Sequence, residues 1–197
     1  MNKKYIVAGG IFSLLLLVGA GCSNTSSQNL EVSTDQLQVH TTTTSSTIQH
    51  DSQIRDDKDF LSHMIPHHEE AIASSQLLLA KTQNEDLKEL LKNIISAQAL
   101  QVTQMRIWYR EWFQEEYVTR GQYTAMMRPA EGDDVKQLEK NFLEDMIKHH
   151  DGAIEKANSI LKVTKRNEIK SLANHMIESQ VKEIEQMKNG QNAWFAE

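Results

Sequence analysis

The residues of this chain that could bind a metal ion are histidines and methionines, and they recur at a constant spacing. Met64 lies four residues before His68, and His67 stands beside His68. The same pattern returns 82 positions later as Met146, His149 and His150. On a helix, residues four apart are neighbours on one face, so each thioether would lie beside an imidazole. Together these ligands suit copper, above all Cu(I), better than magnesium or calcium.

The spacing of 82 positions also holds outside these residues. Residues 60–72 align without a gap with residues 142–154, and the agreement continues downstream. The polar and sulfur-containing residues repeated there are Gln98 with Gln180 and Met105 with Met187. The globular part is therefore one unit used twice, and the polar residues kept in both copies are the best candidates for function.

Apolar residues recur at the spacing of amphipathic helices, and the chain has neither an alternating strand pattern nor a glycine-rich phosphate loop. We predict helices near residues 55–82, 85–116, 134–164 and 167–195. Asn84 and Asn167 mark the break within each repeat, Asp133 or Asp134 can cap the third helix, and Pro66 predicts a kink or a late helix start. Two hairpins with one apolar face each bury those faces most simply against each other. The predicted fold is all-α, a four-helix bundle of two repeated helical hairpins.

The helical period predicts which candidate ligands face the core. Met64 and His68 fall on the apolar stripe, whereas His67 falls about 100° away, at the margin beside His63. The second repeat places His150 in the core, His149 at the margin and Asp145 at the position of His63. Inner sites of His and Met are therefore expected, with His68 beside His150. Outer sites open to solvent, His63 with His67 and Asp145 with His149, are candidates for Cu(II) or zinc.

Buried imidazoles need hydrogen-bond partners, because each unsatisfied polar group costs about 1–3 kcal/mol. Gln98 and Gln180 lie near the centre of the second helix of each hairpin and are the expected partners of His68 and His150. These residues could serve packing alone, in a structural or interaction module. Metal binding is the stronger hypothesis, because His67 is repeated as well, at a margin where packing does not require it.

The N-terminus has the features of a bacterial lipoprotein signal peptide. Residues 1–21 contain two lysines, a short apolar segment and then small residues that lead into Cys22. Cys22 would be lipidated and become the first mature residue; an ordinary secretory signal is the alternative. Residues 22–54 are rich in Ser and Thr and predict a disordered tether, in which His40 and His50 are solvated. The four-helix domain then spans 55–197, with one repeat near 55–116 and the other near 134–197.

Composition limits the function further. Cys22 is the single cysteine, so the mature domain has no disulfide and no thiol ligand, and methionine must supply any soft ligand. The chain carries 21 basic and 27 acidic residues, for a net charge of −6. Loss of Lys3 and Lys4 with the signal peptide makes the balance more acidic, which argues against nucleic acid and favours cations as partners.

The motif Phe-x-x-x-Met-Ile-x-His-His-x-x-Ala-Ile, followed by Gln-x-x-(Gln/Glu)-x-x-x-Met, resembles the bacterial family known as domain of unknown function 305. The resemblance covers both repeats, residues 56–195. It implies an exported, ferritin-like four-helix bundle and, from some members, copper binding and resistance. The implied metal-handling residues are Met64, His67, His68, Met105, Met146, His149, His150 and Met187. The departure is Asp145 at the position of His63, which makes the two outer sites unequal.

The leading hypothesis is an envelope-anchored lipoprotein, not an enzyme, that sequesters copper or passes it on outside the cytoplasm. Zinc is the alternative metal, and other copper-handling proteins or a second copy of the chain are candidate partners. A di-iron oxidase is the enzymatic alternative. It requires Glu-x-x-His motifs, and this sequence contains none.

Overall fold

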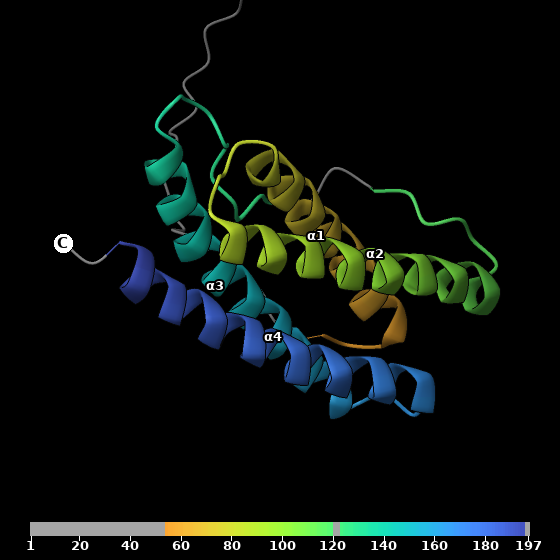
Figure 1. The fold of residues 1–197 in the computed structure, drawn as a ribbon. Coiled ribbons are helices and arrows are strands. Elements are labelled where there is room, and N and C mark those ends of the chain that lie inside the picture. The colour runs from red at the N-terminus through yellow and green to blue at the C-terminus, as the bar shows by residue number, and fades with distance from the viewer. Residues whose placement is uncertain (1–53, 120–122, 196–197) are drawn as a thin grey trace, which may run out of the picture. The chain divides into compact units, whose positions relative to one another are not determined.

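Four helices make up the computed structural model, which describes residues 54–119 and 123–195. They are α1 (Asp57–Leu79), α2 (Glu85–Phe113), α3 (Val135–Leu161) and α4 (Asn167–Trp194) (Figure 1). No strand occurs in the described residues, and none of their helices is long and apolar enough to cross a membrane. The predicted all-α four-helix fold is confirmed. The signal peptide, Cys22, His40, His50 and nearly all of the predicted tether lie outside the described residues.

Three of the four helices begin at a side chain that caps a free backbone N–H. Asp56, Asn84 and Asp134 each accept a hydrogen bond from the amide three residues ahead, at 2.8, 3.1 and 3.0 Å. Asn167, which we expected at a cap or turn, is instead the first residue of α4, and the N-cap residue Arg166 makes no side-chain cap bond. The caps foreseen at Asn84 and Asp134 are confirmed.

Pro66 lies inside α1, and the helix runs through it from Asp57 without the predicted late start. Proline has no N–H, so the carbonyl of Ser62, one turn earlier, loses its helical donor. The hydroxyl of Tyr117 donates to that carbonyl at 3.2 Å. A residue from the segment after α2 thus replaces the missing bond, which explains how the helix accommodates the proline.

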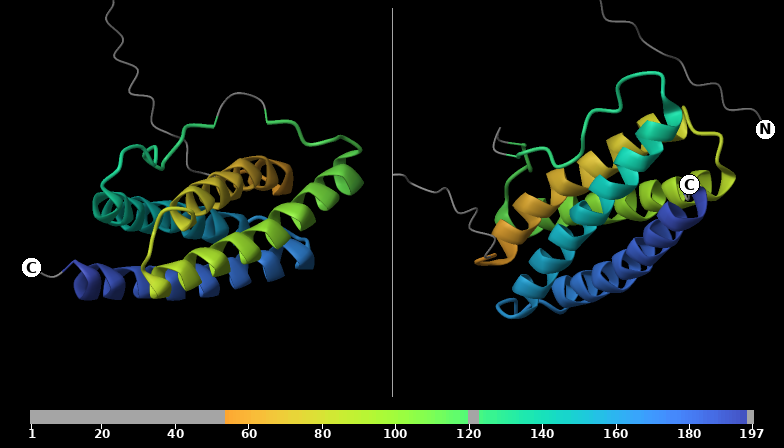
Figure 2. Two further views of the ribbon diagram at one scale, coloured as in Figure 1. Left: turned by 45° about the horizontal axis from the view of Figure 1, so that its top comes forward. Right: turned by 90° about the vertical axis from the view of Figure 1, so that its left-hand side faces the viewer.

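The two hairpins meet mainly through their first helices. α1 packs against α2 and α3 against α4, while the contact between hairpins is far more extensive for α1 with α3 than for α2 with α4. Figure 2 shows α1 and α3 crossing in one layer and α2 and α4 in the other. α1 and α3 therefore have two buried faces, one toward their own hairpin partner and one toward each other.

The apolar core consists of two separate clusters. The first joins the N-terminal half of α1 and the C-terminal half of α2, with Phe60, Met64 and Met105, to the facing halves of α3 and α4. The second joins the remaining halves and contains Met146 and Met187. Between the clusters, in the middle of all four helices, the buried residues are polar.

Candidate metal centre

The middle of the bundle holds a layer of buried histidine and glutamine side chains. Each is at most 8% exposed; the members are His67, His68, Gln98, Gln101, His149, His150 and Gln180. Every helix contributes, and equivalent positions of the two repeats face inward together. The repeated polar residues of the sequence are thus gathered into one buried layer.

The hydrogen-bond partners of the inner histidines differ from those expected. His68 Nε2 lies 2.7 Å from Gln101 Oε1, and His150 Nε2 lies 2.6 Å from Glu183 Oε2. Gln98 and Gln180 are not the partners, so that expectation is wrong. The reason is the antiparallel register of the hairpin, in which the bonded pair lies three residues further along the second helix. The motif itself carried a clue, because Gln101 and Glu183 occupy its Gln/Glu position.

The same register assigns two methionines to each inner histidine. One turn from the pair of His68 and Gln101, it sets Met64 opposite Met105, and both are fully buried in the first apolar cluster. The second repeat does the same with Met146 and Met187 beside His150, in the second cluster. Each inner histidine therefore lies next to a layer with two thioethers.

His67 and His149 are not at a solvent-exposed margin, as the helical period predicted. Each is 1% exposed, and their ring centroids lie 3.6 Å apart with 36° between the ring planes. They meet at the contact between α1 and α3, which buries a second face of both helices. The pair that meets across the two repeats is therefore His67 with His149, and not His68 with His150 as expected.

The partners proposed for the outer sites are engaged elsewhere. His63 is half-exposed, and its Nδ1 bonds the carbonyl oxygen of Asp59 at 2.8 Å. Asp145 accepts hydrogen bonds from Nε of Arg128 at 2.7 Å and from its backbone N–H at 3.0 Å. The predicted solvent-open sites of His63 with His67 and Asp145 with His149 are therefore wrong. Asp145 instead anchors the segment that joins the two repeats.

Glu70 is a site residue that the repeat did not reveal, because the second repeat has Gly152 at the equivalent position. Its carboxylate accepts the backbone N–H groups of Met126 and Met127 at 2.8 and 3.1 Å, and the hydroxyl of Tyr123. Its Oε2 also lies 3.2 Å from Nε2 of His149. Glu70 thus holds the inter-repeat segment over α1 and places a carboxylate beside the central histidine pair.

The second repeat has Gly152 where the first has Glu70, and the two sides of the histidine pair therefore differ. A Cβ atom on Gly152 would lie 3.6 Å from the terminal methyl group of Met126 and 3.9 Å from Nε2 of His67. The side chain of Met126 and the ring of His67 thus approach the same point. His149 is flanked by a carboxylate, whereas His67 lies on the side of a thioether side chain.

Burial favours the neutral form of three of these imidazoles, those of His67, His68 and His149. Loss of solvent lowers the pKa of His67 well below its usual 6.5, with a further effect from His149 and His68. Burial lowers the pKa of His68 to about 3 despite its bond to Gln101, and lowers that of His149 despite its contact with Glu70. Neutral imidazole is the form that binds metal ions.

The pKa of Glu70 is also below its usual value. Burial alone would raise it, but the contact with His149 and the hydrogen bonds from Tyr123, Met127 and Met126 outweigh that effect. The central pair therefore combines the neutral imidazoles of His67 and His149 with the ionised carboxylate of Glu70.

Several buried nitrogen and oxygen atoms of these side chains have no hydrogen-bond partner among the described residues. They include both ring nitrogens of His67, Nδ1 of His68, His149 and His150, both side-chain polar atoms of Gln98 and Oε1 of Gln180. Each such group costs about 1–3 kcal/mol. A bound metal ion would use ring nitrogens of this kind, so the residues present fit one.

The chemistry of the donors limits the choice of ion. Within residues 54–119 and 123–195, no three His, Cys, Asp or Glu side chains are grouped to hold a metal. Any site built on these histidines must therefore include methionine sulfur or a glutamine. Thioether is a soft ligand that favours Cu(I).

The fold and the layer define a helical-bundle protein with a buried His/Met/Gln centre. The chain belongs to the family described as Domain of unknown function (DUF305), whose model matches residues 57–190. No curated protein matches it.

Solved structures of similar proteins superpose on the bundle. CopM in the Cu(I)-bound form is 30% identical, with a TM-score of 0.65 over 72% of this chain and 99% of CopM. CopM in the Cu(II)-bound form is 31% identical, with a TM-score of 0.62 over 71% and 98%. A putative secreted DUF305 protein from Streptomyces coelicolor is 27% identical, with a TM-score of 0.55 over 67% and 88%.

Proposed function

We propose that this protein is an envelope-anchored lipoprotein that binds copper outside the cytoplasm and sequesters it or passes it on. The observation that carries the proposal is the layer of buried histidines, whose ring nitrogens lack partners and whose neighbours in the hairpin register are methionines. The similarity to CopM, which has been solved with Cu(I), Cu(II) and silver bound, supports it.

The proposal includes two kinds of copper site. The inner sites use His68 with Met64 and Met105, and in the second repeat His150 with Met146 and Met187. Their soft thioethers favour Cu(I). The central site combines the imidazoles of His67 and His149 with the thioether of Met126, beside the charge of Glu70. This mixed set suits both oxidation states, with zinc as the alternative ion.

Met126 gives the central pair a route to solvent. It is 40% exposed, whereas the other methionines among the described residues are at most 9% exposed. Its side chain reaches from the inter-repeat segment to Gly152, beside His67. An incoming Cu(I) ion would meet this thioether first and the imidazoles next.

The anchor rests on Cys22 and the residues before it. A lipid on Cys22 would hold the domain at a membrane surface outside the cytoplasm, and the acidic balance of the chain favours cations there. The family member from Streptomyces coelicolor is a putative secreted protein, which supports an extracytoplasmic location.

Titration with Cu(I) against a competing chelator tests the proposal. Changing His68 and His150 together to Gln should weaken binding at the inner sites at least about tenfold, since one ligand is lost from each, while Gln retains a hydrogen bond. Changing Met64 and Met146 to Leu should weaken Cu(I) but not zinc. The matched control is His63→Gln with His175→Gln, two exposed histidines, which should leave both titrations unchanged.

The alternative is a structural or interaction module in which the histidines serve packing alone. It predicts equally weak copper binding by the wild type, both multiple variants and the control. That result would overturn the copper proposal.

A further inference from the structure

The internal repeat allows the two ends of the contact between α2 and α4 to be compared residue by residue. At one end, the ring of Trp112 has both an aromatic and a cationic neighbour. Trp108 stacks on it at 5.1 Å between centroids with 10° between planes, and the guanidinium carbon of Arg166 lies 4.1 Å from its centroid. An arginine therefore occupies an aromatic site in this copy of the repeat.

The equivalent residues at the other end are Trp194, Gly190 and Asn84, each 82 positions from its counterpart. Gly190 replaces Trp108, and a Cβ atom there would lie only 2.6 Å from the Trp194 ring. The ring therefore lies directly against the glycine backbone. Asn84 replaces Arg166, and within residues 54–119 and 123–195 no lysine or arginine lies over Trp194.

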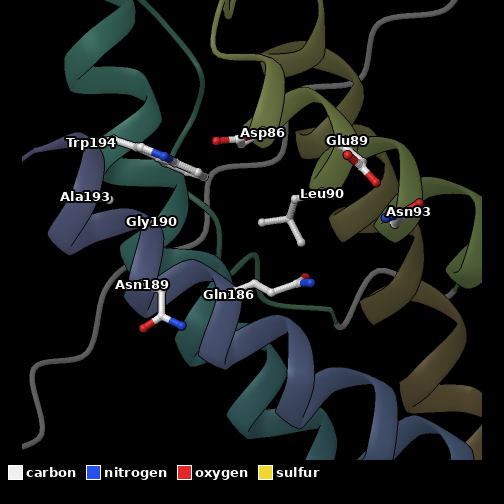
Figure 3. Close-up of a pocket in the computed structure, with 9 residues that line it drawn as sticks. All are labelled: Asp86, Glu89, Leu90, Asn93, Gln186, Asn189, Gly190, Ala193 and Trp194. Carbon is white, nitrogen blue, oxygen red and sulfur yellow. The ribbon is translucent and has the colours of Figure 1, made fainter.

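A cavity of about 370 Å³ lies between α2 and α4 at this end, and Gly190 and Trp194 are among its lining residues. Figure 3 shows the Trp194 ring extending from α4 toward Asp86 on α2, with Leu90 between the helices. Glu89 lines the same cavity, together with amide side chains of both helices. Neither Asp86 nor Glu89 forms an ion pair with any described residue.

The lining specifies the charge and shape of a ligand. Two carboxylates and no lysine or arginine line the cavity, so it attracts a cation. An aromatic face binds a cation placed over it. A guanidinium is planar, stacks on such a face and donates to carboxylates in a fixed geometry, which an ammonium cannot do as well.

We propose that this pocket binds an arginine side chain of a partner polypeptide, with the guanidinium stacked on Trp194 and hydrogen-bonded to Asp86 and Glu89. The occupant is inferred from the charge of the lining and from Arg166, a polypeptide arginine that fills the equivalent site of the other repeat. The pocket is lined by none of the proposed copper ligands. The inference therefore goes beyond copper binding and does not depend on it.

Binding of blocked tripeptides to the purified full chain, followed by the indole N–H signals in NMR spectra, tests the proposal. Gly-Arg-Gly should shift the Trp194 signal and leave the Trp112 signal in place. The same peptide with citrulline, a neutral analogue of arginine, should bind at least about tenfold more weakly, because it lacks the charge. Gly-Lys-Gly should bind about threefold more weakly than the arginine peptide.

Three variants locate the site. Asp86→Asn and Glu89→Gln should each weaken binding of the arginine peptide about fivefold. Gly190→Ala should abolish the Trp194 shift, because the new methyl group must displace the ring. The matched control is Glu168→Gln, since Glu168 is the exposed counterpart of Asp86 in the other repeat, and it should bind like the wild type.

Two results would overturn the proposal. One is equal binding of the arginine and citrulline peptides. The other is an equal loss of binding in Glu168→Gln and Asp86→Asn, which would mean a general effect of surface charge. Circular dichroism of each variant confirms that the helices are retained, and unchanged Cu(I) titrations separate this pocket from the copper centre.

Discussion

His67 and His149 contact each other across the boundary between the two repeats, with their tilted rings 3.6 Å apart between centroids. Each comes from the first helix of its hairpin. Burial is the main cause that lowers the pKa of each ring, and neighbouring histidines lower it further. The first histidine of each His-His pair thus joins the hairpins to each other, while the second joins α1 to α2 or α3 to α4. This division explains why both repeats keep two adjacent histidines.

Acid should destabilise the copper-free protein from about pH 6.5 downward. His67, His68 and His149 are held neutral in the folded state, while in the unfolded state they protonate near 6.5. Their contribution to the free energy of unfolding is complete above the pKa of the unfolded state. It is lost as the pH falls toward the pKa of the folded state. For each histidine, the free energy of unfolding can fall by up to about 1.4 kcal/mol per pH unit in that window.

Urea unfolding between about pH 7 and pH 5 measures this slope. His68→Gln should be less stable overall but have a shallower pH dependence, because glutamine does not titrate. A free energy of unfolding that stays constant over this range would contradict the burial of neutral imidazoles.

Glu70→Gln should loosen the inter-repeat segment. The amide replaces one carboxylate oxygen by a donor, so the bonds from Tyr123, Met126 and Met127 cannot all persist, and the expected loss is about 1–3 kcal/mol. Unfolding curves and faster limited proteolysis between α2 and α3 provide the measurement. The neighbour Glu69 pairs with Arg106 in a partly exposed bridge, so Glu69→Gln should cost less than about 1 kcal/mol. Equal effects of the two variants would contradict the role of Glu70.

Asp145→Asn should destabilise the domain without weakening copper binding. Asp145 is 8% exposed at its side chain and binds both the backbone and the guanidinium of Arg128, so the expected loss is about 1–3 kcal/mol. Glu144→Gln is the control, because Glu144 pairs with the same arginine but is 44% exposed and should cost less than about 1 kcal/mol. A lower copper affinity of Asp145→Asn would indicate that Asp145 is a copper ligand.

Cys22→Ala should release the protein from the membrane. Cys22 is the single cysteine of the chain, so no other residue can carry a thioether-linked lipid, and the described helices provide no membrane span. When cell fractions are partitioned with detergent, the wild-type protein should enter the detergent phase and the variant should stay in the aqueous phase. Wild-type protein that remains wholly in the aqueous phase would contradict lipidation.

Local chemistry determined the helices. Periodicity located all four, and Asn84 and Asp134 were correctly foreseen as caps because a cap depends only on the side chain and the amide three residues ahead. The 82-residue repeat indicated which polar residues are candidates for function. It also indicated that His68 and His150 face the core, because one apolar stripe per helix is enough to bury them.

Only the tertiary structure decided where the other polar residues lie. His67 and His149 are buried because α1 and α3 pack on each other, and a single helix does not reveal that it will have a second buried face. Gln101 rather than Gln98 bonds His68 because the antiparallel register is a relation between two helices. Glu70 joins the centre because the segment around Met126 folds back over it, a contact between residues more than 50 positions apart. The sequence by itself therefore determined the helices and the donor types, and packing between the hairpins decided which donors meet.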